Sequence, residues 1–134
     1  MNRSQLESFL RKHHHEAFLW ARQCCGFDGE LAKDVIQLVF LKVLEGKAKL
    51  KAEDHPKTWL FSVIRFTAMD ELRANGKWLT VEIEEDMAWE SEPTETESHE
   101  DLIRQLPKMQ QEVLLMVFYH DMTLEEAAKV LQLH

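Results

Sequence analysis

Helix-breaking residues are scarce in this chain, which has 4 Gly and 3 Pro among 134 residues. Runs of β-branched residues are short as well, so sheet-rich folds are disfavoured and an all-α fold is expected. No apolar run reaches the roughly 20 residues that a membrane span requires. The first residues also lack the pattern of an export signal. We therefore expect a helical, cytoplasmic protein with no membrane partner.

Cysteine is nearly absent, and the two that occur, Cys24 and Cys25, are adjacent. Adjacent cysteines rarely bond to each other and do not have the spacing of a zinc motif, so a reduced pair is expected. His13, His14 and His15 are consecutive, and on a helix they would point in three directions. An enzyme built on either cluster is disfavoured, and we predict no catalytic residue, metal ligand or cofactor.

Basic residues are in the minority, because 16 Lys and Arg face 24 Asp and Glu and leave a net charge of −8. The excess of acid is local. Residues 1–76 carry 12 basic and 10 acidic side chains, whereas residues 77–134 carry 4 and 14. We predict a helical domain at 1–77, a flexible acidic linker at 78–101 and a small unit at 102–134. The first domain could still face DNA.

Apolar spacing predicts helices over residues 5–25, 31–45, 56–73 and about 107–119. The helix at 31–45 has one clean apolar arc. Its opposite side is mixed and carries four residues, Asp34, Gln37, Leu38 and Leu41. Such a surface suits a protein interface. The alternative is that the two leucines pack on another element of the same domain.

The helix at 56–73 is apolar on nearly two sides. One arc holds Leu60, Val63, Ile64, Thr67 and Ala68; Trp59, Phe66 and Met69 lie opposite, with Arg65 and Arg73 between them. Either the helix is sandwiched between others, or its second side meets a partner. Aromatic rings beside arginines favour unstacked bases and phosphates.

The C-terminal segment has the pattern of a helix, a tight turn and a second helix. Val113, Leu114 and Val117 form the expected core stripe of the first helix, and Thr123 with Glu126 has the form of a capping box. This arrangement corresponds to the start of a helix-turn-helix, and the sequence stops where a recognition helix should begin.

Five segments together resemble bacterial sigma factors of the extracytoplasmic-function group. AKDVIQLVF at 32–40 is similar to that family's AEDLVQETF, and TWLF at 58–61 and DELR at 70–73 are similar to TWLY and DxLR. LPKMQQEVL at 106–114 and MTLEEAA at 122–128 are similar to LPxxxREVLLL and LSYEEIA. The resemblance covers nearly the whole chain apart from the linker.

The resemblance implies a sigma factor that binds core RNA polymerase, through the clamp helices of the largest subunit, and directs promoter recognition and melting. An anti-sigma factor is a further possible partner. The polymerase contact would fall on Asp34, Gln37, Leu38 and Leu41. Promoter DNA would be met by Lys57, Trp59, Arg65, Phe66, Arg73 and Lys77.

The chain departs from the family pattern, and its sparse arginines, its missing recognition helix and the net charge of −10 on residues 77–134 motivate an alternative function. Leu38 stands where Glu is usual, Phe66 stands where Asn is common, and only Lys77 follows Arg73 where the family is rich in arginine. Few phosphate contacts imply weak DNA affinity, and the recognition helix is missing from the sequence. The alternative is a sigma-like protein without full promoter readout that competes for polymerase or for an anti-sigma partner.

Overall fold

The computed structural model describes residues 2–51, 55–76, 102 and 105–131. Within these residues seven helical elements follow one another: α1 (Arg3–Lys12), α2 (His14–Cys24), α3 (Gly29–Leu44), α4 (Pro56–Ala74), α7 (Lys108–Leu114), the π-helical turn η1 (Leu115–Tyr119) and α8 (Leu124–Leu131). No strand occurs in these residues, so the expected all-α class is confirmed. None of the described helices is long and apolar enough to cross a membrane. The expected linker at 78–101 lies outside the described residues.

The single helix expected at 5–25 is wrong, because the chain breaks at His13 into α1 and α2. Three consecutive histidines are weaker helix formers than Ala or Leu, so a break there costs little. The two halves pack on different neighbours. α1 lies on α3 and α2, whereas α2 lies on α3 and α4. The apolar stripe shared by residues 5–25 gave no sign of this break.

Local capping fixes the ends of α3. The Asp28 side chain accepts hydrogen bonds from the backbone N–H groups of Glu30 and Leu31, at 3.0 and 3.1 Å, and so caps the N-terminus. Gly46, with a φ of 79°, follows the last turn in the left-handed conformation that favours glycine. The inner arc of α3 is buried throughout: Leu31, Ala32, Val35, Ile36, Val39 and Val43.

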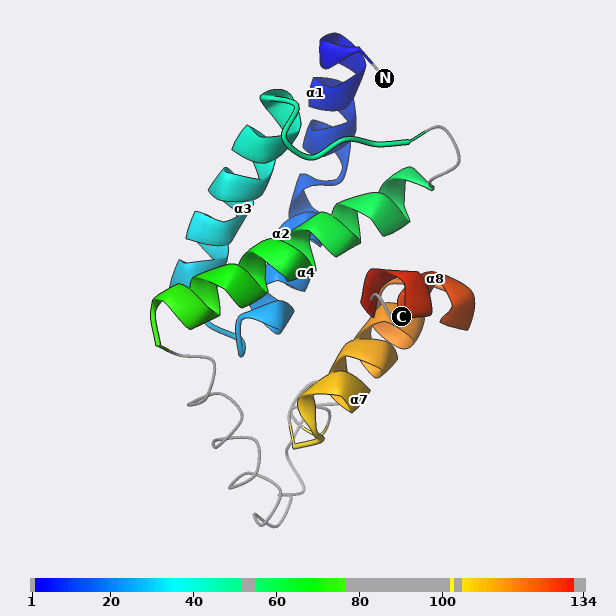
Figure 1. Ribbon diagram of the computed structural model, residues 1–134. Helices are drawn as coiled ribbons and strands as arrows, with labels where there is room; N and C mark the ends of the chain where they lie inside the picture. The colour runs from blue at the N-terminus through cyan, green and yellow to red at the C-terminus, as the bar shows by residue number, and fades with distance from the viewer. Residues whose placement is uncertain (1, 52–54, 77–101, 103–104, 132–134) are drawn as a thin grey trace.

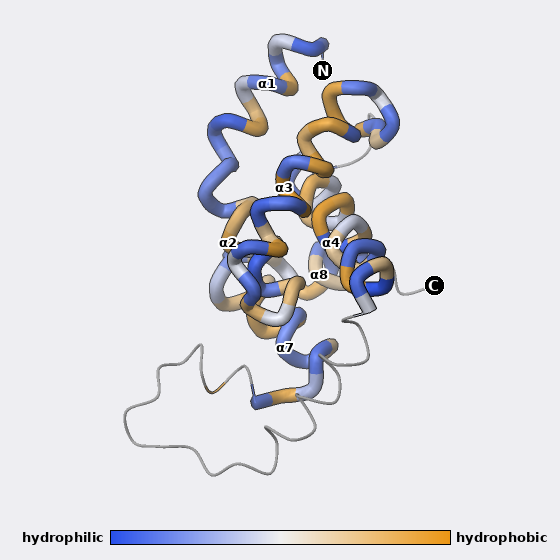
Figure 2. Tube along the Cα trace, turned by 90° about the vertical axis from the view of Figure 1, so that its left-hand side faces the viewer, coloured by the Kyte–Doolittle hydropathy of each residue, from blue (hydrophilic) through white to orange (hydrophobic). Residues whose placement is uncertain are grey.

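Helix α4 runs across the other helices, with α2 and α3 on one side and α8 on another (Figure 1). Pro56 occupies its first turn, and the predicted inner arc is buried apart from the half-buried Val63. The hydrophobic stretches of α3 and α4 lie close to each other, whereas α1 is mostly hydrophilic (Figure 2). Helix α4 is therefore packed between other helices, although Phe66 on its second side stays exposed.

We call α7, η1 and α8 together the C-terminal unit. Its buried stripe is displaced from the expected one. Val113, Leu114 and Val117 are only half-buried, and the buried positions are Gln111, Glu112, Leu115 and Met116. The capping box of α8 is confirmed, because Thr123 N–H donates to Glu126 Oε1 and Glu126 N–H donates to Thr123 Oγ1.

The C-terminal unit shares one hydrophobic core with α1–α4. At its centre the rings of Trp20 and Phe61 stack with centroids 5.3 Å apart, and the Trp20 indole N–H donates to the Phe61 carbonyl. The ring of His120, which ends η1, meets both of them edge-on. Residues from three distant parts of the chain thus join at a single aromatic cluster.

Candidate polymerase and nucleic-acid interfaces

The outer side of α3 is accessible over most of its length. Asp34, Gln37 and Leu41 are exposed and Leu38 is half-buried; Leu41 keeps 53% of its surface exposed. An exposed leucine beside a carboxylate and an amide is a surface of mixed character. These four residues lie on one side of a helix whose other side is fully packed, so their relative positions are rigid. We call them the α3 outer face.

The residues predicted to meet DNA divide into two groups on α4. Phe66 and Arg73, seven positions apart, lie on the same side of the helix and are exposed, Phe66 at 59%. Trp59 lies on that side as well but is only 9% exposed, so it packs under the open surface. Lys77 lies outside the described residues.

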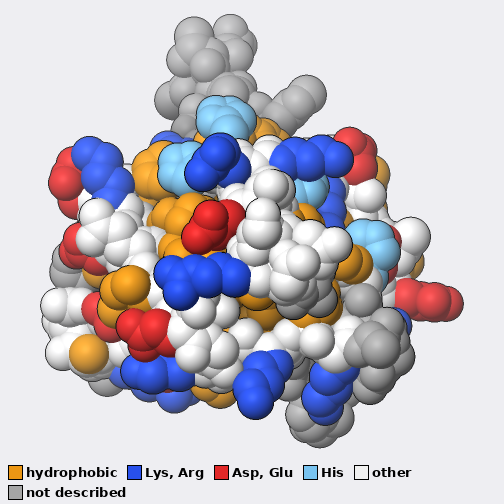
Figure 3. Space-filling model, turned by 90° about the horizontal axis from the view of Figure 1, so that it is seen from above, with side chains coloured by type: hydrophobic (Ala, Val, Ile, Leu, Met, Phe, Trp, Pro, Cys, Tyr) orange, Lys and Arg blue, Asp and Glu red, His pale blue; other side chains and the backbone are white. Residues whose placement is uncertain are grey.

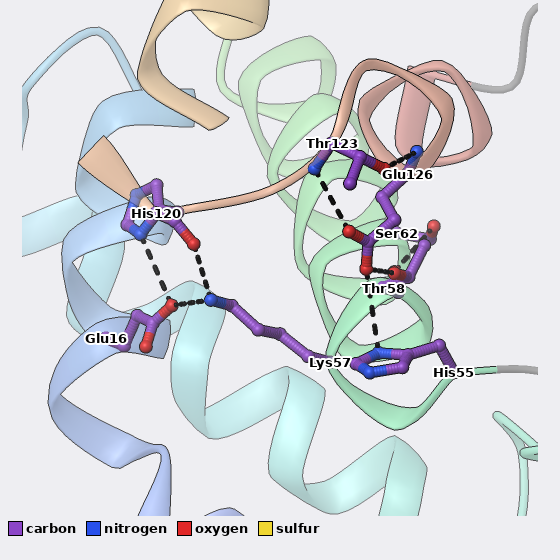
Figure 4. A network of polar contacts seen from close by, with 8 residues as sticks. All are labelled: Glu16, His55, Lys57, Thr58, Ser62, His120, Thr123 and Glu126. Atoms are coloured by element: carbon purple, nitrogen blue, oxygen red, sulfur yellow. Dashed lines mark hydrogen bonds and ion pairs between the residues drawn. The ribbon is translucent and has the colours of Figure 1, made fainter. Parts of the chain in front are cut away.

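Lys57 and Arg65 form the second group, and both are engaged by other parts of the chain. The ammonium group of Lys57 lies 2.7 Å from a Glu16 carboxylate oxygen and donates to the His120 carbonyl (Figure 4). The Arg65 guanidinium donates through Nε to Glu112 Oε2 at 2.5 Å. Neither side chain is free in this arrangement.

A buried polar cluster surrounds His120. Nε2 of its ring lies 2.7 Å from Gln23 Oε1, and Nδ1 lies 3.6 Å from Glu16 Oε1. The neutral ring with its proton on Nε2 donates to Gln23. Burial lowers the pKa of His120 to about 4, although the nearby Glu16 carboxylate opposes that shift. His120 is therefore neutral at physiological pH.

A second polar cluster joins α8 to the start of α4. Glu126 Oε2 accepts a hydrogen bond from Thr58 Oγ1 at 3.2 Å and lies 3.9 Å from His55 Nδ1 (Figure 4). The backbone N–H of Thr123, which donates to the other carboxylate oxygen, is the main cause of the lowered pKa of Glu126. Glu126 thus carries a negative charge at the interface between the C-terminal unit and α4.

The two cysteines lie at the end of α2, where Cys24 contacts the C-terminal unit. Cys24 and Cys25 are both 2% exposed and unbonded to each other, and Lys108 of α7 donates to the Cys24 carbonyl. Burial raises the pKa of the Cys24 thiol. Within the described ranges no group of His, Cys, Asp and Glu could hold a metal ion.

Basic and acidic side chains are interspersed on the face seen in Figure 3. The contacts of Glu16, Gln23, Glu112 and His120 were not anticipated from the sequence. The contacting residues are 41 to 104 positions apart in the sequence, and no local sequence pattern indicates such pairs. One signal was present: Glu112 falls on a helical stripe with Leu115 and Met116, and a carboxylate on an apolar stripe requires a buried cation.

Comparison with known proteins identifies both halves of the chain. Residues 9–77 match the family model Sigma-70 region 2, and residues 97–134 match Sigma-70, region 4. The chain is similar to the RNA polymerase sigma factor YlaC of Bacillus subtilis (strain 168), with 26% identity over 143 residues that cover 97% of this chain and 81% of the relative. No solved structure matches it. With region 2 covering half of its length and region 4 following in the same order, the chain belongs to the sigma-70 family of transcription initiation factors.

Proposed function

We propose that this sigma factor, of the extracytoplasmic-function group, contacts core RNA polymerase through the α3 outer face and acts in the cytoplasm. The single observation that supports this is the exposure of Asp34, Gln37 and Leu41 on a rigidly packed helix. The clamp helices of the largest subunit are the proposed partner surface, by the resemblance described above. As a class, sigma-70 proteins bind polymerase and promoter DNA and are not enzymes.

For promoter DNA we propose the side of α4 that carries Trp59, Phe66 and Arg73, together with Lys77 of the following segment. The exposed Phe66 ring can stack on an unpaired base, and Arg73 can meet a neighbouring phosphate. Lys57 and Arg65 complete the set. Their present partners belong to this chain, so they reach DNA only after those contacts open.

The test of polymerase binding is a double substitution, Asp34→Ala with Gln37→Ala, measured by co-purification with core polymerase. Loss of two central contacts should weaken binding by about 30-fold to several hundredfold, at roughly 1–2 kcal/mol per interface residue. Leu41→Ala, which removes the exposed apolar contact, should act in the same direction.

Glu7→Ala with Ser8→Ala is the matched control. Both residues are exposed on α1, and the pair likewise removes one carboxylate and one polar group. Helical content by circular dichroism should be unchanged in all variants. Equal recovery of polymerase with the α3 and α1 variants would contradict the proposed interface.

Promoter-directed transcription separates this function from the alternative competitor. Purified chain and core polymerase, incubated with a library of genomic promoter fragments, should yield discrete transcripts. If the chain binds polymerase but yields no transcript, the competing sigma-like function takes its place.

A further inference from the structure

The C-terminal unit rests on the helix that we assign to DNA. Lys57 donates to the His120 carbonyl, Thr58 donates to Glu126, and Arg65 donates to Glu112. All three donors belong to α4, and all three acceptors belong to the C-terminal unit. Cationic and hydroxyl donors are also the groups that bind phosphate oxygens. The unit and a nucleic acid would therefore need the same donor atoms.

Two of the three acceptors are carboxylates, so the unit presents negative charge to α4 as a phosphate backbone would. The Arg65–Glu112 pair is the most enclosed, with side chains 13% and 2% exposed. A guanidinium held by a buried carboxylate has no Nε–H left to offer a phosphate. Glu126 is shallower, with 27% of its side chain exposed. In the docked state the charge of Arg65, at the centre of α4, is thus paired with a carboxylate of the same chain.

The α3 outer face, by contrast, stays open in this docked state. Asp34, Gln37 and Leu41 remain exposed while α8 lies along α4. The two proposed functional surfaces of the N-terminal domain therefore differ in their accessibility. One is accessible, and the other is partly occupied.

We propose that the docked C-terminal unit is an intramolecular competitor of nucleic acid for Lys57, Thr58 and Arg65, and that polymerase can bind the α3 outer face before the unit leaves. This inference rests on the proposed function, because it takes α4 as the DNA-binding helix. Free protein in the docked state binds DNA weakly, because Lys57, Thr58 and Arg65 are engaged by the unit. Release of the unit restores these donors.

The test compares Glu112→Gln with Glu125→Gln in the full chain. Glu125 is exposed on α8, so its substitution removes the same charge from the same unit without touching α4. Two readouts are taken. The first is the rate at which maleimide labels the buried cysteines, of which Cys24 contacts the docked unit through its carbonyl, which accepts a hydrogen bond from Lys108. The second is the affinity for a fluorescently labelled single-stranded DNA of random sequence.

Glu112→Gln should raise both the labelling rate and the DNA affinity by about tenfold or more, since it breaks a buried ion pair, and Glu125→Gln should change neither. Glu126→Gln, at a more exposed site, should act in the same direction with a smaller effect, and glutamine keeps the form of the α8 capping box. Circular dichroism confirms that the variants stay helical.

Faster labelling with unchanged DNA affinity would overturn the competition. Unchanged labelling in both Glu112→Gln and Glu126→Gln would overturn the assignment of these carboxylates as the contacts that hold the unit. Neither result depends on polymerase. Phe66→Ala, on the side of α4 that stays exposed, tests the assigned DNA-binding helix by itself. Lower DNA affinity in Phe66→Ala with no gain in Glu112→Gln would overturn the competition alone, whereas unchanged DNA affinity in both variants would overturn the assignment of α4 to DNA.

Discussion

Arg65 of α4 and Glu112 of α7 form an ion pair at 2.5 Å that is almost sealed from solvent, although 47 positions separate them in the chain. The second carboxylate oxygen of Glu112 is buried and has no hydrogen-bond partner. The free-energy cost of removing the two charges from water is therefore only partly offset by their attraction and hydrogen bond. A pair of this kind contributes little to stability as a whole, yet its rupture is expensive.

Replacing Arg65 alone should therefore be strongly destabilising. Arg65→Met leaves the Glu112 carboxylate buried without a cation, and the free energy of unfolding should fall by about 3–5 kcal/mol. Arg65→Met with Glu112→Leu should recover most of this loss, because no charge is left to desolvate. Urea unfolding followed by circular dichroism measures both, and a double variant no more stable than the single one would contradict this account.

Acidification should weaken the packing around His120. Its folded-state pKa, about 4, lies below the usual 6.5 because the ring is buried. The neutral ring therefore stabilises the fold fully above pH 6.5, and this contribution is lost as pH falls toward 4. The loss amounts to about 3 kcal/mol at most. The groups around the ring are Glu16, Lys57, Asp121, Gln23 and the rings of Trp20, Phe61 and Tyr119.

Urea unfolding at a series of pH values between 7 and 4 tests this prediction. His120→Gln should unfold with a shallower pH dependence in that window. The control is His14→Gln, since His14 is exposed, and its profile should follow that of the wild type. A steep profile that persists without His120 would assign the effect to another group.

Removal of the Asp28 cap should cost a small and specific amount. Asp28→Ala deletes the acceptor of the Glu30 and Leu31 amide hydrogen bonds, and the unfolding free energy should fall by about 1 kcal/mol. Asp28→Ser keeps an acceptor and should stay within a few tenths of a kcal/mol of the wild type. Thermal unfolding distinguishes the two, and equal losses would mean that capping is not the cause.

Truncation of Phe66 should separate binding from stability. The ring is largely exposed, so Phe66→Ala should leave the unfolding free energy within about 0.5 kcal/mol of the wild type. Stacking on one base is worth about 1–3 kcal/mol, so single-stranded DNA affinity should drop by about tenfold. Leu124→Ala removes a similarly exposed apolar side chain from α8 and should leave DNA affinity unchanged.

Periodicity alone predicted α3, its buried arc and its outer face, because a helix packed on one side repeats every three to four residues. It also predicted α4 and the cap of α8, where local chemistry decides. It missed the break at His13, because the apolar stripe continues through it. It also placed the buried stripe of α7 at Val113 and Leu114 and left out Glu112, because a carboxylate is expected to be exposed unless a buried cation pairs with it. That cation, Arg65, is distant in the sequence.

The site was foreseen unevenly for the same reason. Exposure of Asp34, Gln37 and Leu41 follows from one helix and its pattern. The engagement of Lys57 and Arg65 depends on a segment far along the chain, which no window of the sequence contains. Contacts of this length are set by tertiary packing, and only the three-dimensional structure reports them.

The elements of the C-terminal unit are short: α7 has 7 residues, η1 has 5 and α8 has 8. Isolated helices below about 12–15 residues are marginal in water. The unit is held by buried apolar side chains that belong to the common core: Leu115, Met116, Met122, Ala127, Val130 and Leu131. Its secondary structure is thus conditional on α2 and α4. A partner that binds the released unit must bury these apolar side chains itself. Binding of the unit to such a partner is therefore coupled to the folding of its helices.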